Sequence, residues 1–185
     1  MASAASAAVL LLGTIAGCSS SGEPARADST PKGTASPKAP PSMSAEDKAK
    51  EQVLAAYRGL SAVRSEAYST GKVDNAKLQE YARDKAASGV VVAVAWYEKR
   101  GLKVVGKPQL APEVTAVNLE AKPRTAVLSD CLDTSKSDTV YKTTGKSAIK
   151  KDSKEPRRKP VTAKAVTVGD RWLISEYEID RSRSC

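Results

Sequence analysis

The chain of 185 residues is long enough for one domain of ordinary size. It contains no histidine, which excludes a Ser-His-Asp triad, a Cys-His dyad and every zinc site that needs a histidine ligand. Its 30 basic and 21 acidic residues leave a formal charge of +9, which indicates a negatively charged partner such as nucleic acid, anionic lipid or an acidic polymer.

An apolar run from Ala7 to Ile15 ends in the sequence Ile15-Ala16-Gly17-Cys18. The run is shorter than the roughly 20 residues that span a bilayer, but it has the length of the apolar part of a signal peptide. Two small residues before a cysteine at this point resemble the lipobox of bacterial lipoproteins. The resemblance implies a signal peptide over residues 1–17, a lipid on Cys18 and a location on the extracellular face of the cell membrane.

Signal peptides ordinarily begin with basic residues, whereas the first basic residue here is Arg26. Two alternatives therefore stay open: translation begins upstream of Met1, or the segment is not an export signal. In an exported protein the positive charge points to anionic lipid or cell-wall polymer, and nucleic acid is not expected as a partner.

Residues 18–43 are expected to form a lipidated, disordered tether. Between Ser19 and Met43 there is no Val, Ile, Leu or aromatic residue, and such a segment cannot bury enough apolar surface to order itself. A flexible chain of this length spans on the order of 25–30 Å. The tether would hold the expected folded domain, residues 44–185, clear of the lipid headgroups.

Ser44 is predicted to cap a long first helix, because acidic residues that suit a helix N-terminus follow it directly. Apolar residues then recur three and four positions apart, which indicates one buried face, and Gly71 is expected to end the helix. A second helix is predicted after Asp74. The apolar positions of the two helices are Val53, Leu54, Tyr57, Leu60, Val63, Ala67, Leu78, Tyr81 and Ala82.

The segment Gly89–Tyr97 fits two kinds of secondary structure. Its β-branched residues favour a strand. The basic residues that follow, ending in Gly101, are typical of the last turn of a helix. We predict a helix here.

Short strands are predicted after Gly101, over Leu102–Gly106, Val114–Ala121, Thr125–Asp133, Val161–Val168 and Trp172–Ile179. The second and third are expected to pair around Lys122-Pro123, and the last two around a tight turn at Gly169-Asp170. In the last strand Leu173, Tyr177 and Ile179 are expected to share the buried face. Helices followed by antiparallel strands predict an α+β fold with the helices on one face of the sheet.

Three pieces of sequence carry a resemblance to a known group: residues 127–133 (VLSDCLD), residues 169–174 (GDRWLI) and Ile179-Asp180-Arg181 followed by Cys185. From about Ala45 onward the chain resembles actinobacterial exported proteins and lipoproteins assigned to the nuclear-transport-factor-2-like (cystatin-like, SnoaL-like) α+β roll. The resemblance implies a long first helix in the concave side of a strongly curved antiparallel sheet. Enzymes of the wider fold use residues of a cone-shaped pocket, but none of their catalytic motifs matches this chain. No catalytic residue or cofactor is therefore carried over.

If Cys18 carries lipid, Cys131 and Cys185 are the two cysteines that remain. An even pair in an oxidising compartment indicates a disulfide. We predict that these two residues are bonded to each other.

The acidic candidates for chemistry lie close together in the sequence. Paired carboxylates can act as acid and base or bind a hard cation, but a solvated strand face and carboxylates that bond their own turns explain such a pattern better. No metal site is expected. The residues are Asp130, Asp133, Glu176, Glu178 and Asp180.

Aromatic residues could line a pocket in the curved sheet, although residues at such spacing more often belong to the core. The candidate pocket residues are Tyr57, Tyr81, Trp96, Trp172 and Tyr177, with Tyr97 beside them.

The segment Lys142–Lys159 contains eight basic residues against Asp152 and Glu155. A solvated loop between strands is the usual explanation of such a charge block. The functional alternative is an anion-binding loop, although no aromatic residue is interleaved for stacking. Its candidate anion-binding residues are Lys150, Lys151, Arg157, Arg158 and Lys159.

Taken together, the sequence predicts a cell-surface lipoprotein whose domain is a non-catalytic binding or scaffold module of the bacterial envelope. The alternative is a small-ligand carrier or an enzyme that uses the cone-shaped pocket. An open pocket with polar groups at its wall would favour the alternative.

Overall fold

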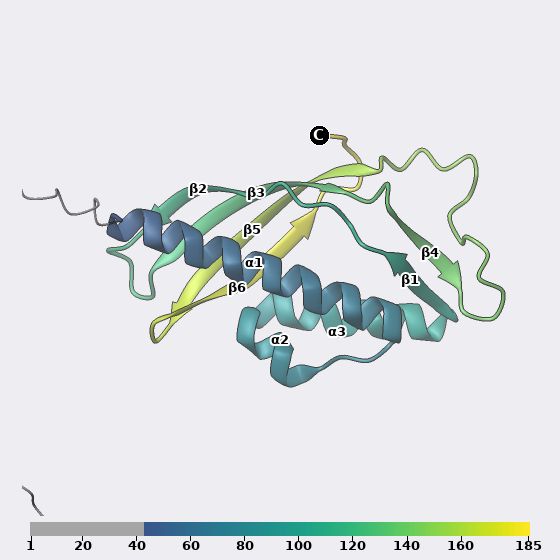
Figure 1. Cartoon of the computed structure of the whole chain (residues 1–185), viewed down its shortest axis with the longest axis horizontal. Coiled ribbons are helices and arrows are strands. Elements are labelled where there is room, and N and C mark those ends of the chain that lie inside the picture. Colours follow the sequence, from purple (N-terminus) through teal and green to yellow (C-terminus); the bar gives the residue numbers. More distant parts are fainter. Residues whose placement is uncertain (1–42) are drawn as a thin grey trace, which may run out of the picture. The chain divides into compact units, whose positions relative to one another are not determined.

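The computed structural model describes residues 43–185. The expected signal peptide, the lipidation site Cys18 and nearly all of the tether lie outside the described residues. The described part forms three helices followed by six strands (Figure 1). None of these helices combines the length and the apolar character needed to cross a bilayer.

The first two helices are capped as the sequence predicts. Helix α1 spans Ala45–Thr70, and the backbone N–H of Asp47 donates to the hydroxyl of Ser44 at 3.0 Å. It ends at Gly71, whose φ of 74° is readily adopted only by glycine. Helix α2 spans Asn75–Tyr81 and is capped by the carboxylate of Asp74.

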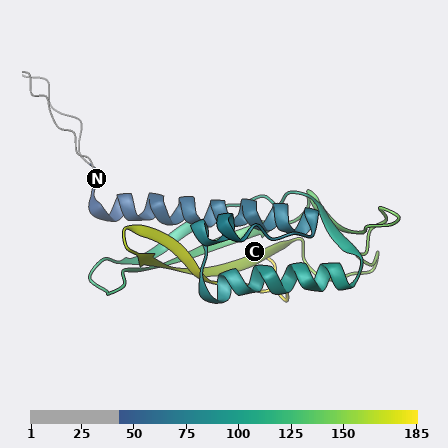
Figure 2. The same cartoon turned by 90° about the horizontal axis from the view of Figure 1, so that it is seen from below.

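The ambiguous apolar segment is helical, since α3 spans Asp84–Lys99. Ala86, Val90 and Val94 lie four residues apart and are buried, whereas Val91 and Val92 are exposed. Packing of this single face against the sheet outweighs the weak helix propensity of the valines. Figure 2 shows α1 and α3 running along the strands.

The strands form two antiparallel sheets that do not close into a barrel within residues 43–185. The larger sheet has the order β2-β3-β5-β6, and the smaller one pairs β1 with β4. The strand bounds are β1 Leu102–Gly106, β2 Glu113–Asn118, β3 Thr125–Asp133, β4 Ser137–Tyr141, β5 Arg158–Val168 and β6 Arg171–Ile179.

The helices cover the face of the larger sheet on which every second residue is buried. In β3 and β5 these buried positions include Ala126, Ala163 and Ala165. The fully buried Tyr57 and Leu60 of α1 belong to the same core cluster. The structure is therefore α+β, with helices on an antiparallel sheet. The main sheet residues of this core are Ala126, Leu128, Val161, Ala163, Ala165 and Ile174.

Three strands differ from the prediction. Strand β2 ends at Asn118, because the side-chain oxygen of Asn118 accepts the N–H groups of Glu120 and Ala121 and turns the chain. Strand β5 begins at Arg158, three residues earlier than expected, because residues 158–160 pair with residues 131–133 of β3. Strand β4 was not predicted at all. It forms only by pairing with β1, some 30 residues earlier in the sequence.

The expectation that Leu173 shares a face with Tyr177 and Ile179 is wrong. The pairing of β5 with β6 shifts between Lys164 and Ala165, so β6 carries one extra residue, Ser175. A one-residue bulge moves all later side chains to the opposite face. Ile174 therefore belongs to the core cluster that includes the helices, whereas Leu173 is buried outside this cluster.

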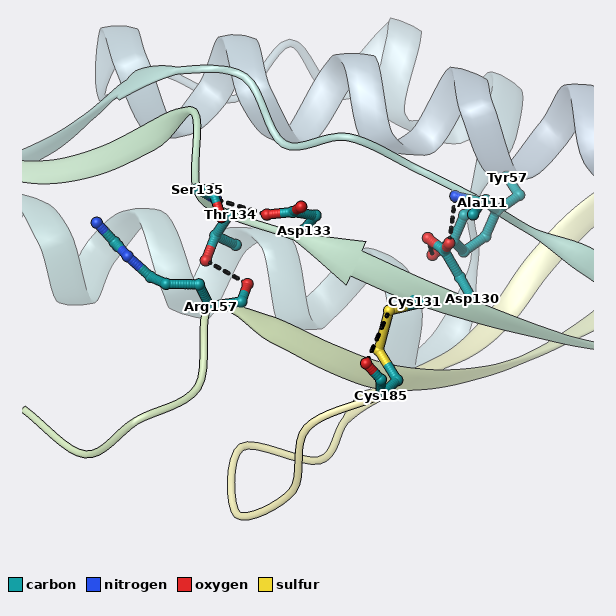
Figure 3. The surroundings of a disulfide bond; sticks show 9 residues. All are labelled: Tyr57, Ala111, Asp130, Cys131, Asp133, Thr134, Ser135, Arg157 and Cys185. Atoms are coloured by element: carbon teal, nitrogen blue, oxygen red, sulfur yellow. Dashed lines mark hydrogen bonds between the residues drawn. A yellow bond between two sulfur atoms is a disulfide. The ribbon is translucent and has the colours of Figure 1, made fainter.

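The structure contains the predicted disulfide. Cys131 of β3 is bonded to Cys185, and the two Cα atoms are 5.9 Å apart. Figure 3 shows how the bond ties the chain end beyond β6 to the middle of the sheet.

Candidate ligand-binding cavity

An open cavity of about 850 Å³ lies at one end of the larger sheet. One wall is made by α1 and α3, with Tyr68 and Trp96 among its residues, and another by the β1–β4 ribbon, with Val104. Leu132, Tyr177 and Ile179 of the sheet also line it. The segment between β4 and β5 contributes Ala148, Ile149, Lys150, Asp152, Ser153, Glu155 and Arg157. Of the large apolar side chains that the described residues leave exposed, Val92, Trp96 and Ile149 line this cavity.

Arg64 of α1 is the half-buried basic residue of the helical wall. Its guanidinium carbon lies 3.8 Å from the centre of the Tyr177 ring, and its Nε–H donates to the Tyr68 hydroxyl at 3.2 Å. Arg64 also borders a second cavity of about 240 Å³. Tyr68 and Tyr177 therefore hold the Arg64 side chain in a position where it lines both cavities.

Two other basic residues of the cavity, Lys159 and Arg181, share one carboxylate. Glu155 pairs with Lys159 at 2.7 Å and with Arg181 at 3.0 Å. The hydrogen bond from Lys159, together with that from Arg181, holds the pKa of Glu155 below its ordinary value. Glu155 therefore stays ionised at neutral pH.

The candidate anion-binding residues differ in whether they line the cavity. Lys150, Arg157 and Lys159 line the cavity, while Lys151 and Arg158 do not. Lys159 is buried on the inner face of β5 and is not part of a solvated loop, since strand β5 extends past it. Arg157 is held in place through its carbonyl oxygen, which accepts both the N–H and the hydroxyl of Thr134 (Figure 3).

The candidate aromatic residues also separate into two groups. Trp96, Tyr97 and Tyr177 line the cavity. Tyr57 and Trp172 are buried in the core, at 0% and 5% exposure, and the ring of Tyr81 packs against Gly59 of α1. Tyr57 reaches the cavity only indirectly, because its ring stacks on Tyr177 at 5.8 Å.

Asp130 is the buried carboxylate of the sheet, and hydrogen bonds satisfy both of its oxygens. Oδ2 accepts from the Tyr57 hydroxyl at 2.7 Å, and Oδ1 accepts from the backbone N–H of Ala111 at 2.6 Å (Figure 3). Burial raises the pKa of Tyr57, so the phenol stays protonated and remains a donor. Asp130 does not line the cavity, and its contacts are those of a structural group.

The remaining acidic candidates bond to their own surroundings. Glu176 pairs with Lys164 at 3.0 Å, Asp133 accepts from the N–H of Ser135, and Asp180 accepts from Ser182 and Arg183. The structure places Glu178 on the solvent-exposed side of β6. Within residues 43–185 no group of three or more acidic or cysteine side chains is placed to hold a metal ion.

The sequence analysis missed Arg64, although the sequence contains a signal for it. Position 64 lies four residues after Leu60 and four before Tyr68, within the apolar stripe of α1. A charged residue inside such a stripe needs a reason. The cavity supplies that reason.

Comparisons with known proteins add little to this description of the cavity. No family model and no curated protein matches the chain. One solved structure that it resembles is the crystal structure of the intermembrane space region of the chloroplast protein ARC6, at 16% sequence identity and a TM-score of 0.42. The match covers 77% of this chain and 100% of that one, and a likeness of this degree supports no statement about function.

Proposed function

We propose that this protein is a lipid-anchored module of the bacterial envelope that binds a small, largely apolar ligand without transforming it. The observation that carries the proposal is the open cavity of about 850 Å³, which has the size of a small-molecule site. Its walls combine aromatic and aliphatic side chains with a few polar groups, as in sites that bury most of a ligand.

The proposed role is non-catalytic because Glu155 and Asp130 are already engaged by protein groups. Glu155 is held by Lys159 and Arg181, and the buried Asp130 is saturated by hydrogen bonds outside the cavity. A general base needs an ionisable group that can reach the substrate. An enzyme that uses the cavity remains the alternative function, and turnover of a bound ligand would favour it.

We further assign the domain to the cystatin-like, nuclear-transport-factor-2-like rolls. A long N-terminal helix packed on the buried face of an antiparallel sheet, with a bulge in β6, supports this assignment. The bulge contributes local twist, which such a curved sheet needs.

Membrane attachment is proposed to take place through a lipid on Cys18. Replacing Cys18 with alanine is expected to move the protein from the membrane fraction to the soluble fraction or to block its export, because the lipid has nothing to attach to. Fractionation followed by immunoblotting measures this. Replacement of the neighbouring Ser19 is the matched control, and unchanged retention of Cys18→Ala would contradict the anchor.

The exposed basic residues Lys151 and Arg158 lie outside the cavity. We propose that they give the tethered domain a weak attraction to anionic lipid or cell-wall polymer. Each such charge contributes about 1 kcal/mol near an anionic surface and is screened by salt.

Binding in the cavity is tested with the neutral apolar dye N-phenyl-1-naphthylamine. The purified full chain is expected to bind the dye, with an increase in dye fluorescence and energy transfer from tryptophan. Trp96 is 46% exposed at the cavity, whereas Trp172 is 5% exposed in the core. Because Trp96 lines the cavity and Trp172 does not, the replacement Trp96→Phe should lower the energy transfer.

A matched pair of variants on α3 serves as the control. Ala93 lines the cavity, and Ala93→Phe should lower dye affinity by filling it. Val91 is exposed on the same helix outside the cavity, so Val91→Phe should leave affinity unchanged. A folded protein that binds no dye, or equal effects of the two variants, would contradict the proposed function.

A further inference from the structure

The charge of the cavity wall is unusual for a site that accepts apolar molecules. Five basic residues line it against the three acidic residues Asp138, Asp152 and Glu155. Lys159 and Arg181 share Glu155, and Lys150 and Arg157 belong to the exposed segment before β5. Arg64 is the basic residue on the helical wall.

The guanidinium of Arg64 has no acidic partner among the described residues, since none of their ion pairs involves it. Only its Nε–H donates to a protein group, the Tyr68 hydroxyl. Within residues 43–185 every side-chain nitrogen or oxygen sealed in the interior has a partner. The Nη groups of Arg64 are therefore accessible from the cavities that the residue lines.

The contacts of Arg64 leave one part of its guanidinium free. Tyr177 covers a face of the planar group at 3.8 Å, and Tyr68 occupies the Nε–H. Within residues 43–185 the two Nη groups at the far end make no hydrogen bond to a carboxylate or a backbone carbonyl. A guanidinium presents such parallel donors to carboxylate and phosphate oxygens, and it keeps its charge at any pH at which the protein is folded.

We propose that Arg64 binds the carboxylate or phosphate headgroup of a small amphipathic anion whose apolar part occupies the cavity. The proposal rests on the proposed function, because it names the chemistry of the ligand for the same cavity. The aromatic and aliphatic walls of the cavity would contact the apolar part of the ligand. The Nη groups of Arg64 would donate charge-assisted hydrogen bonds to its anionic headgroup.

Competition against bound N-phenyl-1-naphthylamine tests this with four compounds that share a decyl or decanoyl chain. Decanoate and decyl phosphate carry the two oxyanion heads, decanol is neutral, and decyltrimethylammonium is positively charged. Hydrogen bonds to a charged group contribute roughly 1.5–3 kcal/mol, so the anions should displace the dye at concentrations at least about tenfold lower than decanol. The ratio of decanoate to decyl phosphate separates a fatty-acid type of ligand from a phosphorylated one.

The replacement Arg64→Gln should abolish the advantage of the anions over decanol while the dye still binds. Arg64→Lys, which keeps the charge but not the paired donors, should retain only part of the advantage. Arg58 is exposed on the same helix and does not line the cavity, so Arg58→Gln is the matched control and should change nothing.

Dye binding by Arg64→Gln shows that the cavity is intact, so a lost anion preference cannot be attributed to unfolding. If anions compete no better than decanol, or if their advantage survives in Arg64→Gln, the role of Arg64 is overturned while the proposed function stands. If the wild-type protein binds neither the dye nor any decyl compound, both proposals fail.

Discussion

Replacing Cys131 and Cys185 together with serine is expected to lower the free energy of unfolding by about 4 kcal/mol. The disulfide joins residues 54 positions apart, and the reduced chain gains the conformational freedom that this closed loop removes from the unfolded state. Urea unfolding of the purified, oxidised protein, followed by tryptophan fluorescence, measures the change. The loss should appear as a lower denaturation midpoint with little change in native fluorescence.

The matched control for this variant is the wild-type protein under reducing conditions, which should unfold at the same urea concentration as the double serine variant. Ser129→Ala, an exposed position on the same strand, should leave the midpoint almost unchanged. Equal stability of the oxidised protein and the double variant would show that the bond does not constrain the unfolded chain.

The same bond has a consequence for the cavity. Arg181, which lines it, lies in the short segment between β6 and Cys185. In that segment Asp180 accepts hydrogen bonds from Ser182 and Arg183, and these bonds hold its pKa below the ordinary value. A chain end held at only one point frays readily. The disulfide therefore also keeps Arg181 next to Glu155.

The parts of the fold that depend on local sequence could be predicted. Ser44, Gly71 and Asp74 act on residues within one helical turn, so the ends of α1 and the start of α2 follow from the sequence alone. The β2–β3 and β5–β6 hairpins likewise join neighbouring segments. Even α3, whose valines favour a strand, carries the basic last turn and glycine that end a helix.

The parts that depend on distant contacts could not be predicted. Strand β4 exists because β1 pairs with it, and the early start of β5 depends on residues 131–133 of β3. The bulge at Ser175 is a property of the pairing with Lys164 and Ala165, and a strict alternation of residues does not reveal it. One extra residue was enough to reverse the predicted face of Leu173.

The residues of the cavity, too, could be predicted only in part from the sequence. Trp96, Tyr97 and Tyr177 could be proposed as wall residues because they are large and aromatic. The same argument also included Tyr57, Tyr81 and Trp172, which do not line the cavity. Whether an aromatic side chain fills a core or lines a cavity depends on what packs against it. Arg64 could have been found as a charge within an apolar stripe, whereas its two tyrosine contacts depend partly on the position of β6.

Asp130 supports this wall from within the core. Its carboxylate holds the hydroxyl of Tyr57, the Tyr57 ring stacks on Tyr177, and Tyr177 lies against the guanidinium of Arg64. Replacement of Asp130 should therefore lower the free energy of unfolding and also weaken the preference of the cavity for anions.

Replacing Asp130 with alanine is expected to lower the free energy of unfolding by about 3 kcal/mol or more, because the Tyr57 hydroxyl and the Ala111 N–H both lose their acceptor in a buried site. Tyr57→Phe removes one donor and keeps the other bond, so its cost should be smaller, about 1–2 kcal/mol. Urea unfolding of the two single variants and the double variant measures their coupling, which should lie between about 0.5 and 3 kcal/mol.

The matched control is Asp133→Ala. Asp133 is on the same strand, and among the described residues its carboxylate accepts a hydrogen bond from the N–H of the nearby Ser135. Its effect on stability should be within about 0.5 kcal/mol. If Asp130→Ala is no more destabilising than Asp133→Ala, or if the changes at Tyr57 and Asp130 are simply additive, the buried bond is not what stabilises this part of the sheet. The four variants can then be compared in the decanoate competition. Loss of anion preference in the variants that carry Asp130→Ala, but not in Asp133→Ala, would connect the core to Arg64 through the two stacked tyrosines.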